Sequence, residues 1–308
     1  MHSDSISILQ YNLNRSKFNT YSLLNDPTSQ PYSILALQEQ YWSEFAKSSL
    51  THHKWTLIEP SNGLQGKPRS VIYVNNEKLS TNDYKIIHMP FRDITAVAIL
   101  TRQLQKPVLL INIYNPRDHD LLTLFERHLY NTIDLRQYGG TIILGDFNLH
   151  HPLWNPPQYQ RHDNAANDLV QLMTTLGLEL IIPEGTVTFP RAGTAIDLVW
   201  GDTETANIIQ RCGIASLNDH GSDHLPIEMI IDLTRHTTTQ EEQRYNLKLA
   251  DWKLMEGKIE EYLPPLNRDA ALTVKELEDL TSQTIDAIAK AVKESTPLCR
   301  PSPFSKRW

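Results

Sequence analysis

The chain has 308 residues, of which 40% are hydrophobic, and a formal net charge of −7. This composition can fill a sizeable core, and it excludes a membrane-spanning protein because no apolar run approaches the roughly 20 residues of a membrane span. The net charge lies entirely before residue 234, and an acidic surface counts against tight non-specific binding to nucleic acid, which depends on Lys and Arg neutralising phosphates.

Short apolar segments typical of strands recur along the first three-quarters of the chain. In chain order they are residues 6–11, 34–37, 71–74, 84–88, 94–101, 108–114, 141–144, 195–200 and 227–233. Apolar residues at helical spacing predict helices over 118–137 and 164–176, the second with Ala165, Leu169 and Leu172 on its buried face. Because many strands are consecutive, we expect an α/β fold of two packed, mixed, mainly antiparallel sheets flanked by helices.

The character of the sequence changes after residue 233. Residues 234–242 form a polar connector, and helix-spaced apolar residues beyond it predict helices over 250–263 and 274–292, separated by Pro264 and Pro265. We therefore predict one domain over residues 1–233, followed over residues 234–308 by a polar connector and a helical segment.

The cysteines and the N-terminus indicate the compartment. Cys212 and Cys299 lie far apart in regions of different character, which predicts reduced thiols rather than a disulfide framework. The first residues lack the basic start and apolar stretch of a signal peptide. We therefore expect an intracellular protein.

A polar tetrapeptide, Gly145-Asp146-Phe147-Asn148, follows the predicted strand at 141–144. Functional side chains are commonly carried at strand ends. On an extended chain, Asp146 and Asn148 point to the same side, where the carboxylate can take a proton from water and the amide can hold that water in place.

A second motif, Ser222-Asp223-His224, precedes the predicted strand at 227–233. Its His224 can bring a positive charge towards a phosphate. Asp197, inside the predicted strand at 195–200, is costly to bury without a partner. Pairing with His224 would orient the imidazole and raise its pKa, whereas the alternative places Asp197 on the exposed face of a half-buried strand.

We assign Glu39, at the end of the predicted strand 34–37, to a metal ion, because Mg²⁺ takes one or two carboxylates and keeps several waters. Asn14 could be a second, weaker ligand. The alternatives are a solvated acid for Glu39 and a turn or helix cap for Asn14. Oxygen-rich ligation favours Mg²⁺ or Mn²⁺. Basic side chains that could reverse the local charge are Arg69, Arg117, Arg161 and Arg191.

With these polar residues in this order, residues 5–233 resemble the endonuclease/exonuclease/phosphatase superfamily. Five stretches look most like the endonuclease of LINE-type (non-LTR) retrotransposons, namely residues 11–16, 37–39, 114–116, 145–154 and 222–226. Within them, His150-His151-Pro152-Leu153-Trp154 is the sharpest cue. Residues 250–252 and 303–308 are similar to the linker that leads into a reverse transcriptase.

The resemblance implies a four-layered α/β sandwich. It also implies a Mg²⁺-dependent phosphodiesterase that nicks duplex DNA and leaves a 3′-hydroxyl to prime reverse transcription. Its partners would be DNA and a reverse transcriptase domain C-terminal to this chain in a longer polyprotein, with no membrane, and its place of action would be the nucleus.

The resemblance also implies a role for each site residue. Glu39 would bind the metal with Asn14 nearby, where repair nucleases of the superfamily often have an aspartate. Asp146 would activate or orient the attacking water. Asn148 and Asn12 would help Asp146. His224, oriented by Asp197, would stabilise the charge at phosphorus. Tyr114 would contact the phosphate or the leaving oxygen, and Asp223 would support the site.

Two other functions fit the same residues. One is a phosphatase or phosphodiesterase of the same superfamily that acts on a small-molecule or lipid phosphate. The other is a non-catalytic nucleic-acid or protein-binding module that descends from such an enzyme.

Overall fold

A computed structural model describes residues 5–60, 66–100, 106–116, 120–159, 161–232, 250–264 and 273–297. The chain divides into two compact units, Met1–Thr237 and Thr238–Trp308, and each is described by itself. The polar connector predicted at 234–242, the closing residues 303–308, Arg117 and Cys299 lie outside the described residues.

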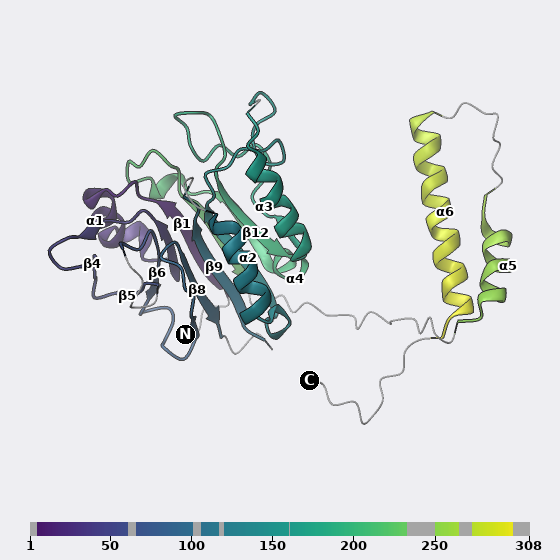
Figure 1. Cartoon of the computed structure of the whole chain (residues 1–308), viewed down its shortest axis with the longest axis horizontal. Coiled ribbons are helices and arrows are strands. Elements are labelled where there is room, and N and C mark those ends of the chain that lie inside the picture. The colour runs from purple at the N-terminus through teal and green to yellow at the C-terminus, as the bar shows by residue number, and fades with distance from the viewer. Residues whose placement is uncertain are drawn as a thin grey trace. The chain divides into compact units, whose positions relative to one another are not determined.

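The first unit is built on two six-stranded sheets (Figure 1). The first sheet has the order β13 (Ile209–Ile214), β14 (Ile227–Asp232), β1 (Ser5–Asn12), β2 (Ile34–Gln38), β6 (Ser70–Asn75), β5 (Trp55–Ile58). The second has the order β11 (Leu178–Leu180), β12 (Asp197–Asp202), β10 (Gly140–Asp146), β9 (Val108–Tyr114), β8 (Ile94–Ile99), β7 (Tyr84–Ile87). A separate hairpin joins β3 (Trp42–Ser43) to β4 (Ser48–Ser49).

Both sheets are mixed, as the sequence predicted. The parallel pairs are β1 with β2 and β9 with β10, and the other ladders in the described residues are antiparallel. Along the central strands, alternate side chains point to opposite faces. Ile8, Ala36 and Ile72 of the first sheet therefore pack in one cluster with Leu110 and Ile142 of the second.

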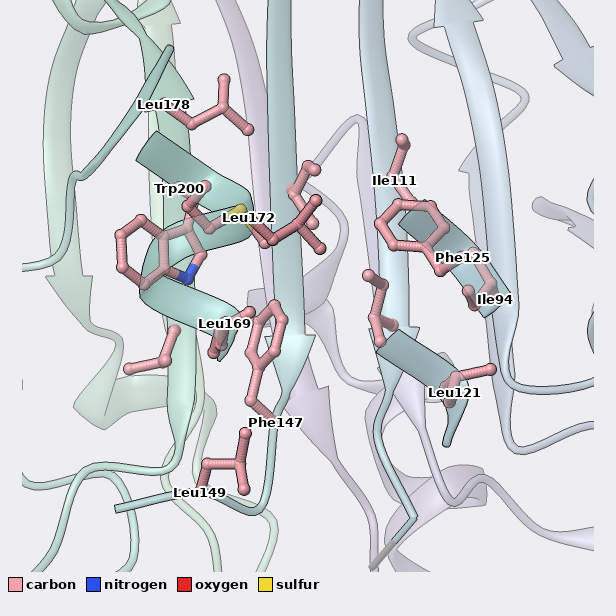
Figure 2. Close-up of a cluster of buried hydrophobic side chains, with 14 of the residues drawn as sticks. Ile94, Ile111, Leu121, Phe125, Phe147, Leu149, Leu169, Leu172, Leu178 and Trp200 are labelled. Carbon is pink, nitrogen blue, oxygen red and sulfur yellow. The ribbon is translucent and has the colours of Figure 1, made fainter. Parts of the chain in front are cut away.

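Helices cover the outer faces of both sheets. Helices α2 (Leu121–Thr132) and α3 (Asn164–Thr175) lie over the second sheet (Figure 1), where Phe125 and Leu172 pack in one cluster with Ile111 and Trp200 (Figure 2). Leu23 and Leu24 of α1 (Lys17–Asn25) pack with the outer residues of the first sheet. The result is the predicted four-layered α/β sandwich.

The shorter helices fill connections. Helix α4 (Thr203–Ile208) follows β12, and 3₁₀ turns occupy Pro27–Ser29, Leu135–Gln137 and Ser216–Asn218. The helix predicted at 118–137 ends earlier, at Thr132, and continues as one of these 3₁₀ turns. In α3, Leu169 and Leu172 are buried as predicted, but the buried alanine is Ala166 and Ala165 is exposed.

The predictions omitted several elements, namely strands β3, β4, β5, β11 and β13 and helices α1 and α4. Two of them, β13 and α1, lack apolar periodicity. Edge strand β13 is half exposed and contains Gln210, Arg211 and Gly213. Helix α1 is mostly polar, and it begins where the Ser16 hydroxyl accepts a hydrogen bond from the Asn19 N–H (3.1 Å). Tertiary contacts, rather than local pattern, define both.

The second unit contains helices α5 (Trp252–Tyr262) and α6 (Val274–Ser295), close to the predicted ranges. Thr273 and Glu276 form a capping box at the start of α6. The Tyr262 hydroxyl donates to Glu294 (2.8 Å), which ties the two helices together. No helix in the described parts of the chain is long and apolar enough to cross a membrane.

Candidate active site

One edge of the sandwich gathers the polar ends of five strands. Asn12 pairs with Gln38 at the ends of β1 and β2, and Asp146 at the end of β10 pairs with both Tyr114 of β9 and Asp197 of β12. Each of these residues lies on the inner face of its strand, whose positions further from this edge, such as Ile8, Ala36 and Ile142, are apolar. The inter-sheet layer therefore changes from apolar to polar towards this edge.

Glycine is required at position 145 by its backbone and its neighbour. Gly145 has a φ of 139°, and a Cβ added there would lie 1.9 Å from the Ile113 carbonyl oxygen. Only glycine permits this approach, which places the next residue, Asp146, at the end of β10. Four non-glycine residues with left-handed backbone also lie around this edge, namely Asn14, Arg15, Glu39 and Asn148.

The Asp146 carboxylate is buried and held by two amides. One oxygen accepts from Asn12 Nδ2 (2.8 Å) and Asn148 Nδ2 (3.2 Å), and the other accepts from the Asn148 main-chain N–H (2.9 Å). Burial and the negative charge of Asp197 raise the pKa of Asp146 to about 7, although His224 and the hydrogen bonds oppose this shift. A carboxylate with such a pKa can exchange a proton near neutral pH.

His224 faces Asp146 and is held from behind by Asp197. Its Nδ1 lies 2.8 Å from Asp197 Oδ2, and its Nε2 lies 3.9 Å from Asp146 Oδ2. Burial lowers the pKa of His224, but the carboxylates of Asp197, Asp146 and Asp223 outweigh burial and raise it to about 9. The imidazole is therefore a cation at neutral pH. Asp197 is fully buried, not on an exposed strand face.

Glu39 and Tyr114 lie on the other side of Asp146. Glu39 forms an ion pair with Arg15, in which Arg15 Nε donates to Glu39 Oε1 over 2.8 Å. Tyr114 lies close to Glu39, and burial, with the negative charges of Glu39 and Asp146, raises the Tyr114 pKa. The Arg69 guanidinium stacks 5.1 Å from the centre of the Tyr114 ring. Tyr114 is thus close to both Glu39 and Asp146.

Two of the expected site residues lie at its margin. The Asn14 side chain is exposed, and its main-chain N–H donates to Asn12 Oδ1 (2.9 Å). Asp223 is half-buried and lies within 3.4 Å of the Ser222 hydroxyl. The structure therefore groups Asn12, Glu39, Tyr114, Asp146, Asn148, Asp197 and His224, with Asn14 and Asp223 outside this group.

Sequence reasoning missed four buried polar residues that contact the group directly or through one another. They are Gln10, Gln38, Asn112 and Thr188, whose hydroxyl accepts the main-chain N–H of Asp197 (3.1 Å). A signal for the first three was available, because each lies two residues after an apolar inner-face residue of its own strand. Alternation within a strand, followed past the apolar run, identifies them.

The donor set fits a divalent cation. Ligand atoms of Asp146, Asp197 and His224 lie within 4.8 Å of one another, and these three residues could hold a metal ion. The hydrogen bond of His224 to Asp197 and the positive charge of its imidazole argue against metal binding at that nitrogen. Glu39 and Asp146 offer hard carboxylate oxygens, the donors that Mg²⁺ prefers.

A cleft of about 530 Å³ adjoins Glu39. Its basic residues are Arg15, Lys67, Arg69 and Arg92, and Tyr41 and Trp42 add aromatic surface. Arg69 and Arg92 both pair with Asp93, which fixes their direction. Arg15 pairs with Glu39 and Lys67 with Glu44, so the four basic side chains exceed their three carboxylate partners by one charge.

Comparison with known proteins agrees with this architecture. Residues 108–228 match the model of the family described as Endonuclease-reverse transcriptase. No curated protein matches the sequence significantly.

Three solved structures share the fold. The endonuclease domain of TRAS1, a telomere-specific non-LTR retrotransposon, has 20% identity and a TM-score of 0.60, covering 75% of this chain and 100% of that one. The AP endonuclease LMAP from Leishmania major has 13% identity and a TM-score of 0.55 over 74% and 88%. The APE2 catalytic domain from Xenopus laevis has 18% identity and a TM-score of 0.52 over 74% and 92%. The sequence match thus covers residues 108–228, and the likeness to these three structures shows that the first unit has the same fold.

Proposed function

We propose that the first unit is a metal-dependent phosphodiesterase that nicks DNA and leaves a 3′-hydroxyl from which a reverse transcriptase can start synthesis. The observation that carries this proposal is the pairing of Asp146 with His224, a proton acceptor and a cation 3.9 Å apart in one buried site. The similar structures support it, since one is the endonuclease domain of the retrotransposon TRAS1 and another is the AP endonuclease LMAP.

The side chains divide the work of hydrolysis. Asp146 takes a proton from the attacking water, and the amides of Asn12 and Asn148 hold its carboxylate in one orientation. The His224 cation stabilises negative charge that develops on the phosphate oxygens. Tyr114, on the opposite side of Asp146, contacts the phosphate or the leaving oxygen. Most of the catalysis is therefore positioning and electrostatic stabilisation.

A Mg²⁺ or Mn²⁺ ion bound at Glu39 would supply further neutralisation of charge on the phosphate and the leaving oxygen. Arg15 pairs with Glu39 and would have to share or release that carboxylate. Asn14, with its exposed side chain, is placed to act through a bound water rather than from inside the site.

The basic cleft beside Glu39 supports DNA as the substrate. Its four basic side chains can neutralise phosphates of a strand that continues past the site, and Trp42 offers a surface for a base. A small phosphate ester would need no such extension. The family description also names a reverse transcriptase, which supports such a partner. We propose that this partner is a domain C-terminal to this chain and that the two act in the nucleus.

The test is nicking of supercoiled plasmid with Mg²⁺, with Mn²⁺ and with EDTA. We expect nicking with either metal, none with EDTA, and products that a DNA polymerase extends from a 3′-hydroxyl. Glu39→Ala, Asp146→Ala and His224→Ala should lose nicking, whereas Glu179→Gln, an exposed carboxylate on β11, should retain it.

Other outcomes would identify the alternatives. Hydrolysis of a small phosphodiester without plasmid nicking would show a small-molecule enzyme. Binding of duplex DNA without cleavage of either substrate would show a non-catalytic module. Three folded variants that nick as well as the parent would refute the proposed chemistry.

A further inference from the structure

A series of buried amides crosses the inter-sheet layer behind the site. Gln10 of β1, Gln38 of β2 and Asn112 of β9 are each no more than 1% exposed. Gln10 Nε2 donates to Gln38 Oε1 (2.6 Å) and to Asp197 Oδ1 (3.0 Å). Gln38 Nε2 donates to Asn112 Oδ1 and to the Ala36 carbonyl (3.3 Å). The series therefore links the first sheet to Asp197 in the second.

The direction of every amide in the series is fixed. Asn112 Nδ2 donates to two main-chain carbonyls, those of Leu37 (3.0 Å) and Val71 (2.9 Å), so its oxygen must face Gln38. Gln38 consequently turns its nitrogen to Asn112 and its oxygen to Gln10. Gln10 then has to direct its nitrogen at Asp197, because turning any one amide would bring two donors or two acceptors together.

This arrangement assigns one oxygen of Asp197 to each neighbour. Oδ1 accepts from Gln10, which leaves Oδ2 for His224 Nδ1 (2.8 Å). Rotation of the Asp197 carboxylate would break both hydrogen bonds. With Asp197 fixed, the imidazole keeps its Nε2 towards Asp146.

We infer that Gln10 is a positioning residue for the proposed hydrolysis, acting through Asp197 on the orientation of His224. This inference rests on the proposed function. A purely structural role would leave one feature of Gln10 unexplained: its Oε1 is buried without a hydrogen-bond partner in the described structure, which costs stability. An apolar side chain of the same length would avoid that cost, so the amide is better explained by its donor to Asp197 than by packing.

The experiment compares Gln10→Met with Asn75→Leu. Asn75 is equally buried in the same sheet, and its Nδ2 donates to the carbonyls of Gln30 (3.0 Å) and Tyr32 (3.0 Å), whereas its side chain makes no hydrogen bond to Asp197 or His224 among the described residues. Both changes remove a buried amide. We expect Gln10→Met to lower kcat for plasmid nicking by about tenfold to a hundredfold at unchanged KM, and Asn75→Leu to leave kcat unchanged.

Two further readouts separate positioning from general damage. In a double-mutant cycle, Gln10→Met should reduce kcat little when Asp197 is already Asn, because both changes affect one pathway. In metal-free protein, the low-field proton signal of His224 Nδ1–H, assigned by its loss in His224→Gln, should move or broaden in Gln10→Met and stay in Asn75→Leu. This signal tests the orientation even if the protein does not cut DNA.

Clear results would overturn the inference. They are a parental kcat and an unchanged Nδ1–H signal in Gln10→Met, additive losses in the cycle, or an equal loss of kcat in Asn75→Leu. If Gln10→Met does not fold, Gln10→Asn provides the test, since it keeps an amide at this position but is one methylene too short to donate to Asp197 in the same way. Parental kcat and an unchanged signal in folded Gln10→Asn would equally refute the proposal.

Discussion

The two ends of the inter-sheet layer use the same strands for different purposes. At one end, Leu110 and Ile142 pack with Val199 in an apolar cluster. At the other end, later inner-face positions of these strands carry polar groups, and both Asn112 and Asp146 are hydrogen-bonded through their side chains. The inward-facing positions of the same strands therefore stabilise the fold at one end by burying apolar area. At the other end they hold the polar side chains of the site in place through hydrogen bonds.

The largest expected effect comes from the polar end. Asp146→Asn keeps the shape of the side chain but removes the proton acceptor, so we expect plasmid nicking to fall by on the order of a hundredfold or more. The unfolding midpoint should stay or rise, because the raised pKa of Asp146 shows that the fold disfavours its ionised form at neutral pH. An Asp146→Asn variant that loses both stability and activity would show that the polar end also stabilises the fold.

The apolar end should show the opposite pattern. Leu110→Ala, at a position with 0% exposure, should lower the free energy of unfolding by about 2–5 kcal/mol. Nicking per folded molecule should stay within about twofold of the parent, because no site residue is removed. Denaturant unfolding measures the first quantity and nicking at low temperature the second, with Ile86→Ala on an exposed edge position as the control.

The pH dependence of nicking tests the charge at the polar end. The pKa of His224 is raised to about 9, so the cation is present below that pH and is lost as pH rises through it. The rate should therefore fall above about pH 9. Asp197→Asn removes a negative charge that raises this pKa, so the fall should begin at lower pH. A rate that stays constant across this range in the parent would contradict a role for the His224 cation.

The smallest effect is expected in the basic cleft, outside both ends of the layer. Lys67→Gln and Arg92→Gln should weaken duplex DNA binding a few-fold, and each should reduce the slope of log affinity against log salt by about 1. Hydrolysis of a small phosphodiester should be unchanged. Lys85→Gln, exposed on edge strand β7, is the control. Unchanged DNA affinity and salt slope in both cleft variants would remove the cleft from the path of the DNA.

The sequence predicted the central strands and the main site motifs because both depend on local pattern. Apolar runs such as those of β9 and β10 can form little else, and Asp146 and Asn148 stand directly after one of them. The amide series was not predicted, because it depends on which residues of different strands face one another across the layer. The exposed side chain of Asn14 was also beyond local pattern, because it follows from a left-handed backbone at that residue.

The shared alternation makes the strands unusually intolerant of changes in length. Deleting one residue within β10 ahead of Gly145 would turn Asp146 away from the inter-sheet layer and towards α2 and α3, while apolar side chains would enter the site. A single deletion would therefore disrupt the packing of the core and remove Asp146 from the site. Insertions and deletions should therefore be tolerated best in the connections between strands, because there they do not change which face of the sheet the following strand residues point to.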